Sequence, residues 1–147
     1  GSGIFGCGAL ALGAKHVTFV DKDRKVLRTA RANVDVLGKV MKKTFSSSFL
    51  YADVAAFHER VDTVLQNPPF GVQEEHADRT FLLAAMTAKA AYSFHKIETK
   101  EFIEAFVRNY HKKAAFVKVY SFPLKKTMVF HTKPVYRVDV GLWRISS

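Results

Sequence analysis

Cysteine, glycine and proline are all scarce in this chain, and each scarcity excludes a class of protein. A single cysteine, Cys7, excludes an internal disulfide and a self-contained cysteine-rich zinc site. With 8 glycines and 4 prolines among 147 residues, collagen-like and low-complexity structures are excluded as well. No apolar run approaches the roughly 20 residues of a membrane-spanning helix, and no segment resembles a signal peptide. These features, with 48% hydrophobic residues, predict one globular domain over residues 1–147 and a reducing cytoplasm as its location.

Acidic side chains are few as well: 13 Asp and Glu stand against 23 Lys and Arg, which gives a net charge of +10. Residues 1–99 have a net charge of +3, and residues 100–147 have one of +7. A segment this basic fits a polyanion such as RNA or DNA, through neutralisation of phosphates and release of counterions. The alternative is a basic surface that only keeps the protein soluble.

Short apolar runs alternate with amphipathic stretches along the chain. Strands are predicted at residues 16–20, 48–52, 62–66, 92–95, 115–122 and 135–145. Helices are predicted at residues 9–12, 23–37, 78–91 and 99–113, with Asp23 and Thr99 as N-caps and Gly38 just past the end of the second helix. This alternation predicts an α/β fold with a mostly parallel, doubly wound sheet. The last two strands have no helix between them, which predicts an antiparallel edge.

Polar residues follow the predicted strands at the edge where α/β sheets bind their ligands. Asp21 and Asp53 each end a strand, and residues 1–6 read G-x-G-x-x-G with Asp21 eighteen residues after Gly3. That spacing is typical of an acid that binds both hydroxyls of an adenosine ribose. The alternative is a tight glycine turn and an aspartate that caps a helix.

The most specific motif follows the strand at residues 62–66 and consists of Asn67, Pro68, Pro69 and Phe70. The side-chain carbonyl of Asn67 and the main-chain carbonyl of Pro68 can accept the hydrogens of an exocyclic amine, which favours a pyramidal nitrogen that is ready to attack a methyl group. The two prolines stiffen the loop before the reaction, and Phe70 offers a face for stacking of a base. The alternative is a proline turn that ends a strand above a packed phenylalanine. A nicotinamide-dependent oxidoreductase, which the glycine motif alone would allow, has no role for this segment.

These motifs together resemble the class I S-adenosylmethionine-dependent methyltransferases of the N6-adenine type, which have a Rossmann-like fold. More narrowly, several segments are similar to the family that methylates an adenine in small-subunit ribosomal RNA: residues 66–71, the helix around Phe81, residues 92–96, and residues 130–133 before residues 138–140. The resemblance covers essentially the whole chain. It implies methyl transfer from S-adenosylmethionine, without a metal, to N6 of an adenine in RNA.

The resemblance also implies roles for single residues near the cofactor. Gly1, Ser2 and Gly3 would form the turn that approaches the methionine part of S-adenosylmethionine. Asp21 would bind the ribose hydroxyls, with Lys22 beside the adenine. Asp53 would accept from the adenine amino group, next to the main-chain amide of Val54.

Four further residues are similar to family positions at the substrate side. His95, Lys96, His131 and Lys133 would flank the pocket and contact RNA phosphates. The alternative is that they are polar strand ends with surface charge.

The family pattern begins before Gly1, because it places an acidic residue and one more glycine ahead of this turn. We therefore expect an N-terminally truncated domain whose first, central strand is absent from this chain. Relatives of the family often work with a small zinc-binding activator subunit that pairs with an edge strand, for which residues 45–51 are the candidate. Two other functions stay open: methylation of a different planar amine or amide, such as guanine N2 or a protein glutamine, and a non-catalytic RNA-binding assembly factor.

Overall fold

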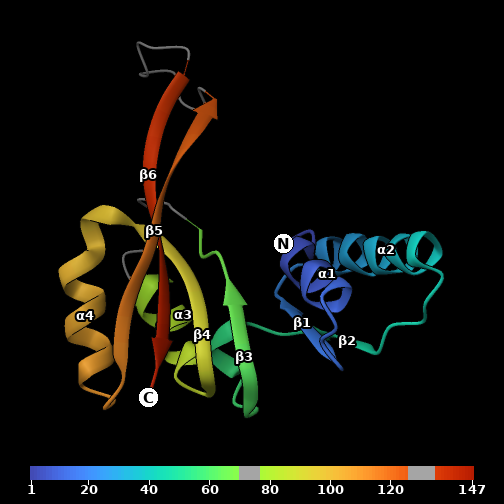
Figure 1. The fold of residues 1–147 in the computed structure, drawn as a ribbon, viewed down its shortest axis with the longest axis horizontal. Helices are drawn as coiled ribbons and strands as arrows, with labels where there is room; N and C mark the ends of the chain where they lie inside the picture. The colour runs from blue at the N-terminus through green and yellow to red at the C-terminus, as the bar shows by residue number, and fades with distance from the viewer. Residues whose placement is uncertain (70–76, 126–134) are drawn as a thin grey trace. The chain divides into compact units, whose positions relative to one another are not determined.

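The computed structural model describes residues 1–69, 77–125 and 135–147. These residues form two compact units, Gly1–His58 and Glu59–Ser147, and each has helices packed on a β-sheet (Figure 1). The expectation of one domain over the whole chain stays a prediction. None of the helices in the described ranges is long and apolar enough to cross a membrane.

The first unit is a two-stranded parallel sheet with two helices packed against it. Along the chain it contains α1 (Ile4–Ala11), β1 (Val17–Asp21), α2 (Arg24–Met41), β2 (Ser47–Tyr51) and the short 3-10 helix η1 (Val54–Ala56). The register pairs Val17 with Ser47 and Asp21 with Tyr51. The rings of Phe19 and Phe49 stack at 4.9 Å in the core, among the buried residues Cys7, Leu10, Leu27, Ala30 and Val34.

Helix α2 begins where the sequence predicts and ends four residues later. The Asp23 carboxylate caps it by accepting from the backbone amide of Lys25 at 2.7 Å. The helix then continues through Gly38 to Met41, and Lys42 takes the left-handed conformation that ends it. The amide of Lys43 donates back to the Gly38 carbonyl at 3.0 Å, and a Cβ on Gly38 would lie 2.9 Å from the Lys43 carbonyl oxygen. Gly38 therefore makes room for the terminating turn instead of forming it.

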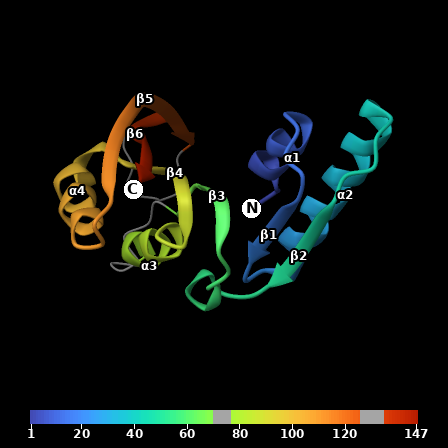
Figure 2. The ribbon, with the colours of Figure 1, turned by 60° about the horizontal axis from the view of Figure 1, so that its bottom comes forward.

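The second unit is a four-stranded mixed sheet in the order β3-β4-β6-β5 (Figure 2). Its elements are β3 (Val61–Gln66), α3 (Ala77–Ala85), β4 (Ala88–Lys96), the 3-10 helix η2 (Ile97–Thr99), α4 (Lys100–Arg108), β5 (Lys113–Lys125) and β6 (Val135–Ser146). Strands β3 and β4 are parallel, whereas β6 is antiparallel to both β4 and β5. The antiparallel end of the fold is confirmed. The described sheets are only partly parallel, since β1–β2 and β3–β4 are their parallel pairs.

One face of this sheet carries the core of the second unit. Helices α3 and α4 both pack there, and the buried cluster comprises Leu82, Ala85, Ala91, Ile103, Phe106, Val107, Trp143 and Ile145. The register of β4 with β6 places Ala91 opposite Ile145 and Ser93 opposite Trp143, so these residues lie on one face. His95 lies on the same face as Ser93, two residues further along β4.

Three local predictions in this unit are wrong. The helix predicted at residues 99–113 ends at Arg108, and the chain passes through His111, which has φ 56°, into strand β5 at Lys113. The helix predicted at residues 78–91 ends at Ala85, and the chain from Ala88 onward is strand β4. Alanines at residues 88, 90 and 91 favour a helix locally, but pairing with β3 and β6 overrides that preference. Thr99 does not cap α4 with its side chain, because its hydroxyl donates to the carbonyl of Lys96 at 2.8 Å.

Candidate functional site

Polar residues of the first unit gather at the carboxyl ends of its two parallel strands. Asp21 is the last residue of β1 and is paired in register with Tyr51, the last residue of β2. Asp53 follows Tyr51 by two residues and begins η1. Both carboxylates therefore lie at the same edge of one sheet, which is the ligand-binding edge of α/β folds.

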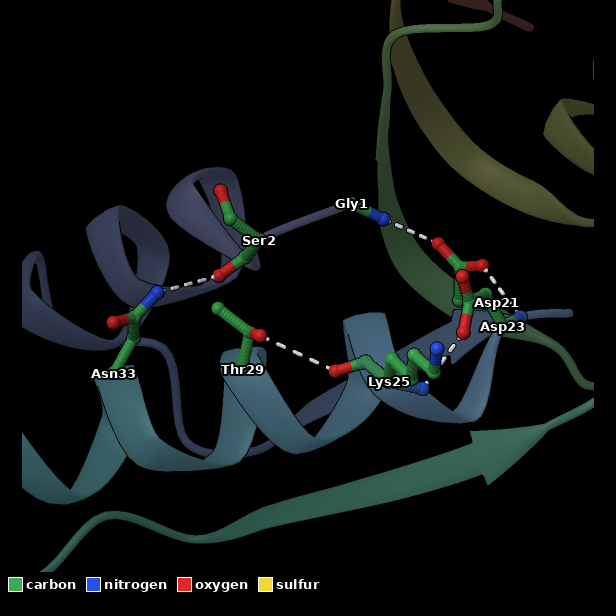
Figure 3. Close-up of polar contacts among 7 residues, drawn as sticks. All are labelled: Gly1, Ser2, Asp21, Asp23, Lys25, Thr29 and Asn33. Carbon is green, nitrogen blue, oxygen red and sulfur yellow. Dashed lines mark hydrogen bonds and ion pairs between the residues drawn. The ribbon is translucent and has the colours of Figure 1, made fainter.

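The Asp21 carboxylate points toward the glycine-rich turn (Figure 3). Oδ2 accepts a hydrogen bond from the amino group of Gly1, and Oδ1 accepts from the backbone amide of Asp23 at 2.9 Å. One oxygen is thus held by the chain after β1, while the other meets a donor that approaches from the turn. A hydroxyl group in that direction would find the same acceptor.

The environment of Asp21 favours its ionised form. Partial burial by itself would raise the pKa of this carboxyl group, but hydrogen bonds from the Gly1 amino group and from the amides of Asp23 and Lys22, together with the charge of the amino group, lower it overall. An ionised carboxylate offers only acceptors, as the binding of two hydroxyl groups requires.

The glycine-rich turn and the start of α1 can lie close to the rest of the first unit because Gly3 and Gly6 have no side chains. Gly3 has φ +80°, and a Cβ there would lie 2.8 Å from Cβ of Ala30. A Cβ on Gly6 would lie 2.2 Å from Cε1 of Phe19, so α1 can pack on β1 only with glycine there. The side chain of Asn33 on α2 donates to the carbonyl of Ser2 at 2.8 Å and holds the turn from the other side (Figure 3).

Asp53 is positioned by the 3-10 helix that it caps. Its Oδ1 accepts from the backbone amide of Ala55 at 2.9 Å, and its side chain is otherwise exposed. Lys22 is exposed beside Asp21, and Val54 is half-buried.

These residues fit the S-adenosylmethionine that the sequence implies. Asp21 and Asp53 are acceptors suited to ribose hydroxyls and an adenine amino group, and the turn at residues 1–3 lets a ligand approach the backbone closely because a Cβ on Gly1 would meet nothing within 4 Å. Among the side chains that the structure describes, no group of three or more His, Cys, Asp and Glu residues is arranged to hold a metal ion.

The Asn-Pro-Pro segment belongs to the second unit and directly follows β3. Asn67 is exposed, Pro68 is almost completely buried, and Pro69 is exposed again. Within residues 1–69, 77–125 and 135–147, no hydrogen bond engages the Asn67 side chain, so its amide is available to a substrate there. Phe70, the fourth residue of the motif, lies outside the described residues.

The structure describes two of the four residues that were expected to contact RNA phosphates, His95 and Lys96. The imidazole of His95 is fully buried and lies 2.6 Å from the Ser93 hydroxyl, so it does not have the exposure that a phosphate contact needs. This burial corrects the expected surface role of His95. Lys96 ends β4 and is half-buried. His131 and Lys133 lie outside the described residues.

Sequence reasoning missed three polar residues that support these sites. Asn33 holds the glycine-rich turn, and Gln66 and Ser93 form a buried hydrogen bond of 2.9 Å behind the Asn-Pro-Pro segment. A polar residue at an inward position of a strand was the available signal for Gln66 and Ser93.

Two surfaces outside these sites combine aromatic and basic side chains. A hollow of about 340 Å³ lies beside β2 and is lined by Arg24, Leu27, Arg28, Arg31, Phe49 and Tyr51. Strand β5 exposes Tyr120 and Phe122, with the Lys118 ammonium group 5.5 Å from the centre of the Tyr120 ring.

Comparison with known proteins connects these features to a family. The model of the family described as "Conserved hypothetical protein 95" matches residues 1–119. An uncharacterised protein of Methanocaldococcus jannaschii is 32% identical over 99% of this chain and 69% of its own length. The rRNA N(6)-adenosine-methyltransferase Mettl5 of Drosophila melanogaster is 26% identical over 95% of this chain and 69% of its own length.

Solved structures agree with this assignment. A candidate RNA methyltransferase from Pyrococcus horikoshii is 35% identical and superposes with a TM-score of 0.83. The match covers 100% of this chain and 71% of the Pyrococcus chain. The magnesium protoporphyrin IX methyltransferase of Synechocystis PCC 6803, solved with bound S-adenosylmethionine, covers 100% of this chain with 66% of its own at a TM-score of 0.68; its identity of 15% shows the fold alone. The chain therefore belongs to the Conserved hypothetical protein 95 family and is a class I S-adenosylmethionine-dependent methyltransferase.

Proposed function

We propose that this protein methylates the exocyclic N6 of an adenine in RNA, with small-subunit ribosomal RNA as the substrate. The observation that carries the proposal is the Asn67 amide, which is exposed directly after a parallel strand and is followed in the sequence by the rigid, buried Pro68. The Drosophila relative named as an rRNA N(6)-adenosine-methyltransferase supports the choice of base and of RNA.

The chemistry of the Asn-Pro-Pro segment suits an adenine amine. The lone pair of that nitrogen is delocalised into the ring, which makes it a poor nucleophile. Carbonyl oxygens of Asn67 and Pro68 would accept its two hydrogens and leave the lone pair directed at the methyl group. Because Pro68 and Pro69 restrict the backbone, these acceptors are held before the base arrives. Phe70 would stack on the base.

The first unit would hold the cofactor through Asp21, Asp53, Lys22, the Val54 amide and the turn at residues 1–3. The cofactor, when bound, supplies a methyl group on a sulfonium, which is already activated for transfer. The protein's own contribution is therefore the alignment of the amine with the methyl group.

The exposed residues of β5 support RNA over a protein substrate. Tyr120 and Phe122 are exposed aromatics beside Lys118, a combination that suits stacking of bases and neutralisation of phosphates. The charge of +7 in residues 100–147 points in the same direction. Lys96, His131 and Lys133 remain proposed phosphate contacts.

We further propose that a small zinc-binding activator subunit pairs with β2. In the described part of the chain, β2 pairs with β1 along one edge only. Leu50 and Tyr51 are exposed at the end of β2. Co-expression with such a subunit should give one peak in size-exclusion chromatography. The variant Leu50→Asp should weaken that complex, whereas Val40→Asp, at an exposed position of α2, should not. A fully active monomer would contradict an obligate partner.

Methyl transfer to small-subunit ribosomal RNA tests the main proposal. Full-length protein, labelled S-adenosylmethionine and the RNA should give N6-methyladenosine, identified by mass spectrometry of the nucleosides. Asn67→Ala should reduce incorporation about 100-fold, the usual loss when one preorganised hydrogen-bonding group leaves a reacting centre. Asn109→Ala, at the exposed end of α4, is the matched control and should be fully active.

Other outcomes of the same experiment would identify the rival functions. Methylated guanine would show that the target is guanine N2, and label in protein would show that the target is a glutamine side chain. If the intact protein binds RNA but does not bind S-adenosylhomocysteine in calorimetry, it is a non-catalytic assembly factor instead.

A further inference from the structure

A connected set of buried polar side chains begins at Gln66, the residue just before the Asn-Pro-Pro segment. The side-chain nitrogen of Gln66 donates to the Phe81 carbonyl at 3.0 Å and to the Ser93 hydroxyl at 2.9 Å. The Ser93 hydroxyl in turn lies 2.6 Å from Nε2 of His95. Ser93 and His95 are fully buried and Gln66 is 8% exposed. These hydrogen bonds therefore join the end of β3 to α3 and β4 inside the second unit.

The direction of the two hydrogen bonds from Gln66 follows from their partners. A main-chain carbonyl can only accept, so the amide nitrogen of Gln66 must face Phe81 and the amide cannot be flipped. Both hydrogens of that nitrogen are then used, and Ser93 accepts one of them. The Ser93 hydroxyl then meets Nε2 of His95 at 2.6 Å, where it donates to the ring or accepts from it according to the tautomer of the imidazole. Each bond thus orients the next.

Gln66, Ser93 and His95 are polar residues on a face of the sheet that is otherwise apolar. Their neighbours in the core are apolar, among them Ala91, Trp143 and Ile145. Buried polar groups are costly unless all their hydrogen bonds are made, and a fully connected set holds its members in one arrangement. Gln66 is therefore fixed more tightly than packing alone would fix the end of a strand.

What is fixed this way is the residue before Asn67. Gln66 is the last residue of β3 and is paired in register with Ser93, while Asn67 begins the exposed segment. Pro68, next along the chain, has a restricted φ and is buried. Asn67 is thus held between an anchored residue and a rigid one.

We propose that the buried chain of Gln66, Ser93 and His95 is a positioning device for Asn67. It holds the end of β3 so that the Asn67 carbonyl is in place when a substrate amine arrives. This inference rests on the proposed role of Asn67 in methyl transfer. His95 acts here through Ser93 and Gln66, so it is a positioning residue that touches no substrate.

Three variants of the full-length protein separate positioning from general stability. Ser93→Ala removes the central hydroxyl, and His95→Leu removes the imidazole that meets it. His95→Gln keeps an amide group that can accept near the position of Nε2. Ile103→Val is the matched control, because Ile103 is fully buried in the same core but takes no part in the chain.

Positioning predicts that kcat falls and that the KM for S-adenosylmethionine does not change. Ser93→Ala and His95→Leu should each lower kcat about 10-fold, His95→Gln should restore most of it, and Ile103→Val should leave it unchanged under conditions where all variants are folded. In the Asn67→Ala background, Ser93→Ala should cost nothing further, since both changes remove the same function. A further 10-fold loss in that background, or an equal loss in Ile103→Val, would overturn the inference.

A measurement without activity distinguishes this inference from the proposed function. NMR relaxation should give the backbone amide of Asn67 an order parameter of about 0.85, the value of rigid backbone, which falls toward about 0.6 in Ser93→Ala and not in Ile103→Val. If the wild type is rigid but methylates no RNA, the proposed function fails and the positioning of Asn67 stands. If Asn67 is mobile in the wild type or unaffected by Ser93→Ala, the positioning fails whatever the activity.

Discussion

Gly6 of α1 lies against the ring of Phe19 so closely that a Cβ on residue 6 would be 2.2 Å from Cε1 and 2.5 Å from Cζ of that ring. Phe19 is at the centre of the first unit, where it stacks on Phe49. The third glycine of the G-x-G-x-x-G pattern therefore serves the packing of helix on strand, and the turn at residues 1–3 depends on that packing for its position.

The variant Gly6→Ala should destabilise the protein by about 1–3 kcal/mol, the usual cost of overpacking a core. Gly8→Ala is the matched control on the same helix. A Cβ on Gly8 meets nothing within 4 Å, so this change should be neutral or stabilise by up to about 1 kcal/mol. Urea denaturation of the two variants measures the difference, and equal stabilities would contradict the close packing.

Removal of the Asp21 charge should weaken cofactor binding. Hydrogen bonds to a charged group contribute about 1.5–3 kcal/mol, so Asp21→Asn should reduce affinity for S-adenosylhomocysteine by about 10- to 100-fold in calorimetry. Asp35→Asn changes an equally charged, exposed residue of α2 and should bind normally. Unchanged affinity in Asp21→Asn would remove Asp21 from the site.

The lowered pKa of Asp21 predicts how stability depends on pH. The ordinary pKa of this carboxyl group is 3.8, and its folded pKa lies below that value because of the Gly1 amino group and the neighbouring amides. Its contribution is therefore fully present above about pH 4 and is lost as the pH falls through the folded pKa. Wild type should lose stability relative to Asp21→Asn over that acid range.

Lys118 should contribute to RNA affinity through its charge. If it neutralises one phosphate, Lys118→Ala should reduce the slope of log K against log salt concentration by about 0.7, the value for a single strand. Lys89→Ala is the control, because Lys89 is exposed but its ammonium group lies 2.6 Å from the Asp62 carboxylate. Binding measured by fluorescence anisotropy at several salt concentrations gives both slopes. Equal slopes for both variants would exclude β5 as an RNA-binding surface.

Local patterns account for much of the fold. The cap at Asp23, the strands that end at Asp21 and Gln66, and the antiparallel pair at the end of the chain all agree with the sequence. Each of these features depends on residues close together in the chain, such as a side chain that accepts from an amide two residues away. The Asn-Pro-Pro segment was located in the same way, since two prolines end a strand wherever they occur.

Long-range partners decided the rest, and local preference was a poor guide there. Residues 88–91 became strand because β3 and β6 offered pairing on both sides, although their alanines favour a helix. His95 was expected at the surface, but side chains of β4 alternate between the two faces of the sheet, and His95 lies on the buried face with Ser93.

By itself, the sequence determined the α/β character of the chain, the polar residues at the strand ends and the basic charge of the last third, because these follow from composition and short-range periodicity. Only the tertiary structure decided that Gln66, Ser93 and His95 meet behind Asn67. Hydrogen bonds between side chains 27 residues apart depend on which strands pair and in which register, and no local pattern specifies that.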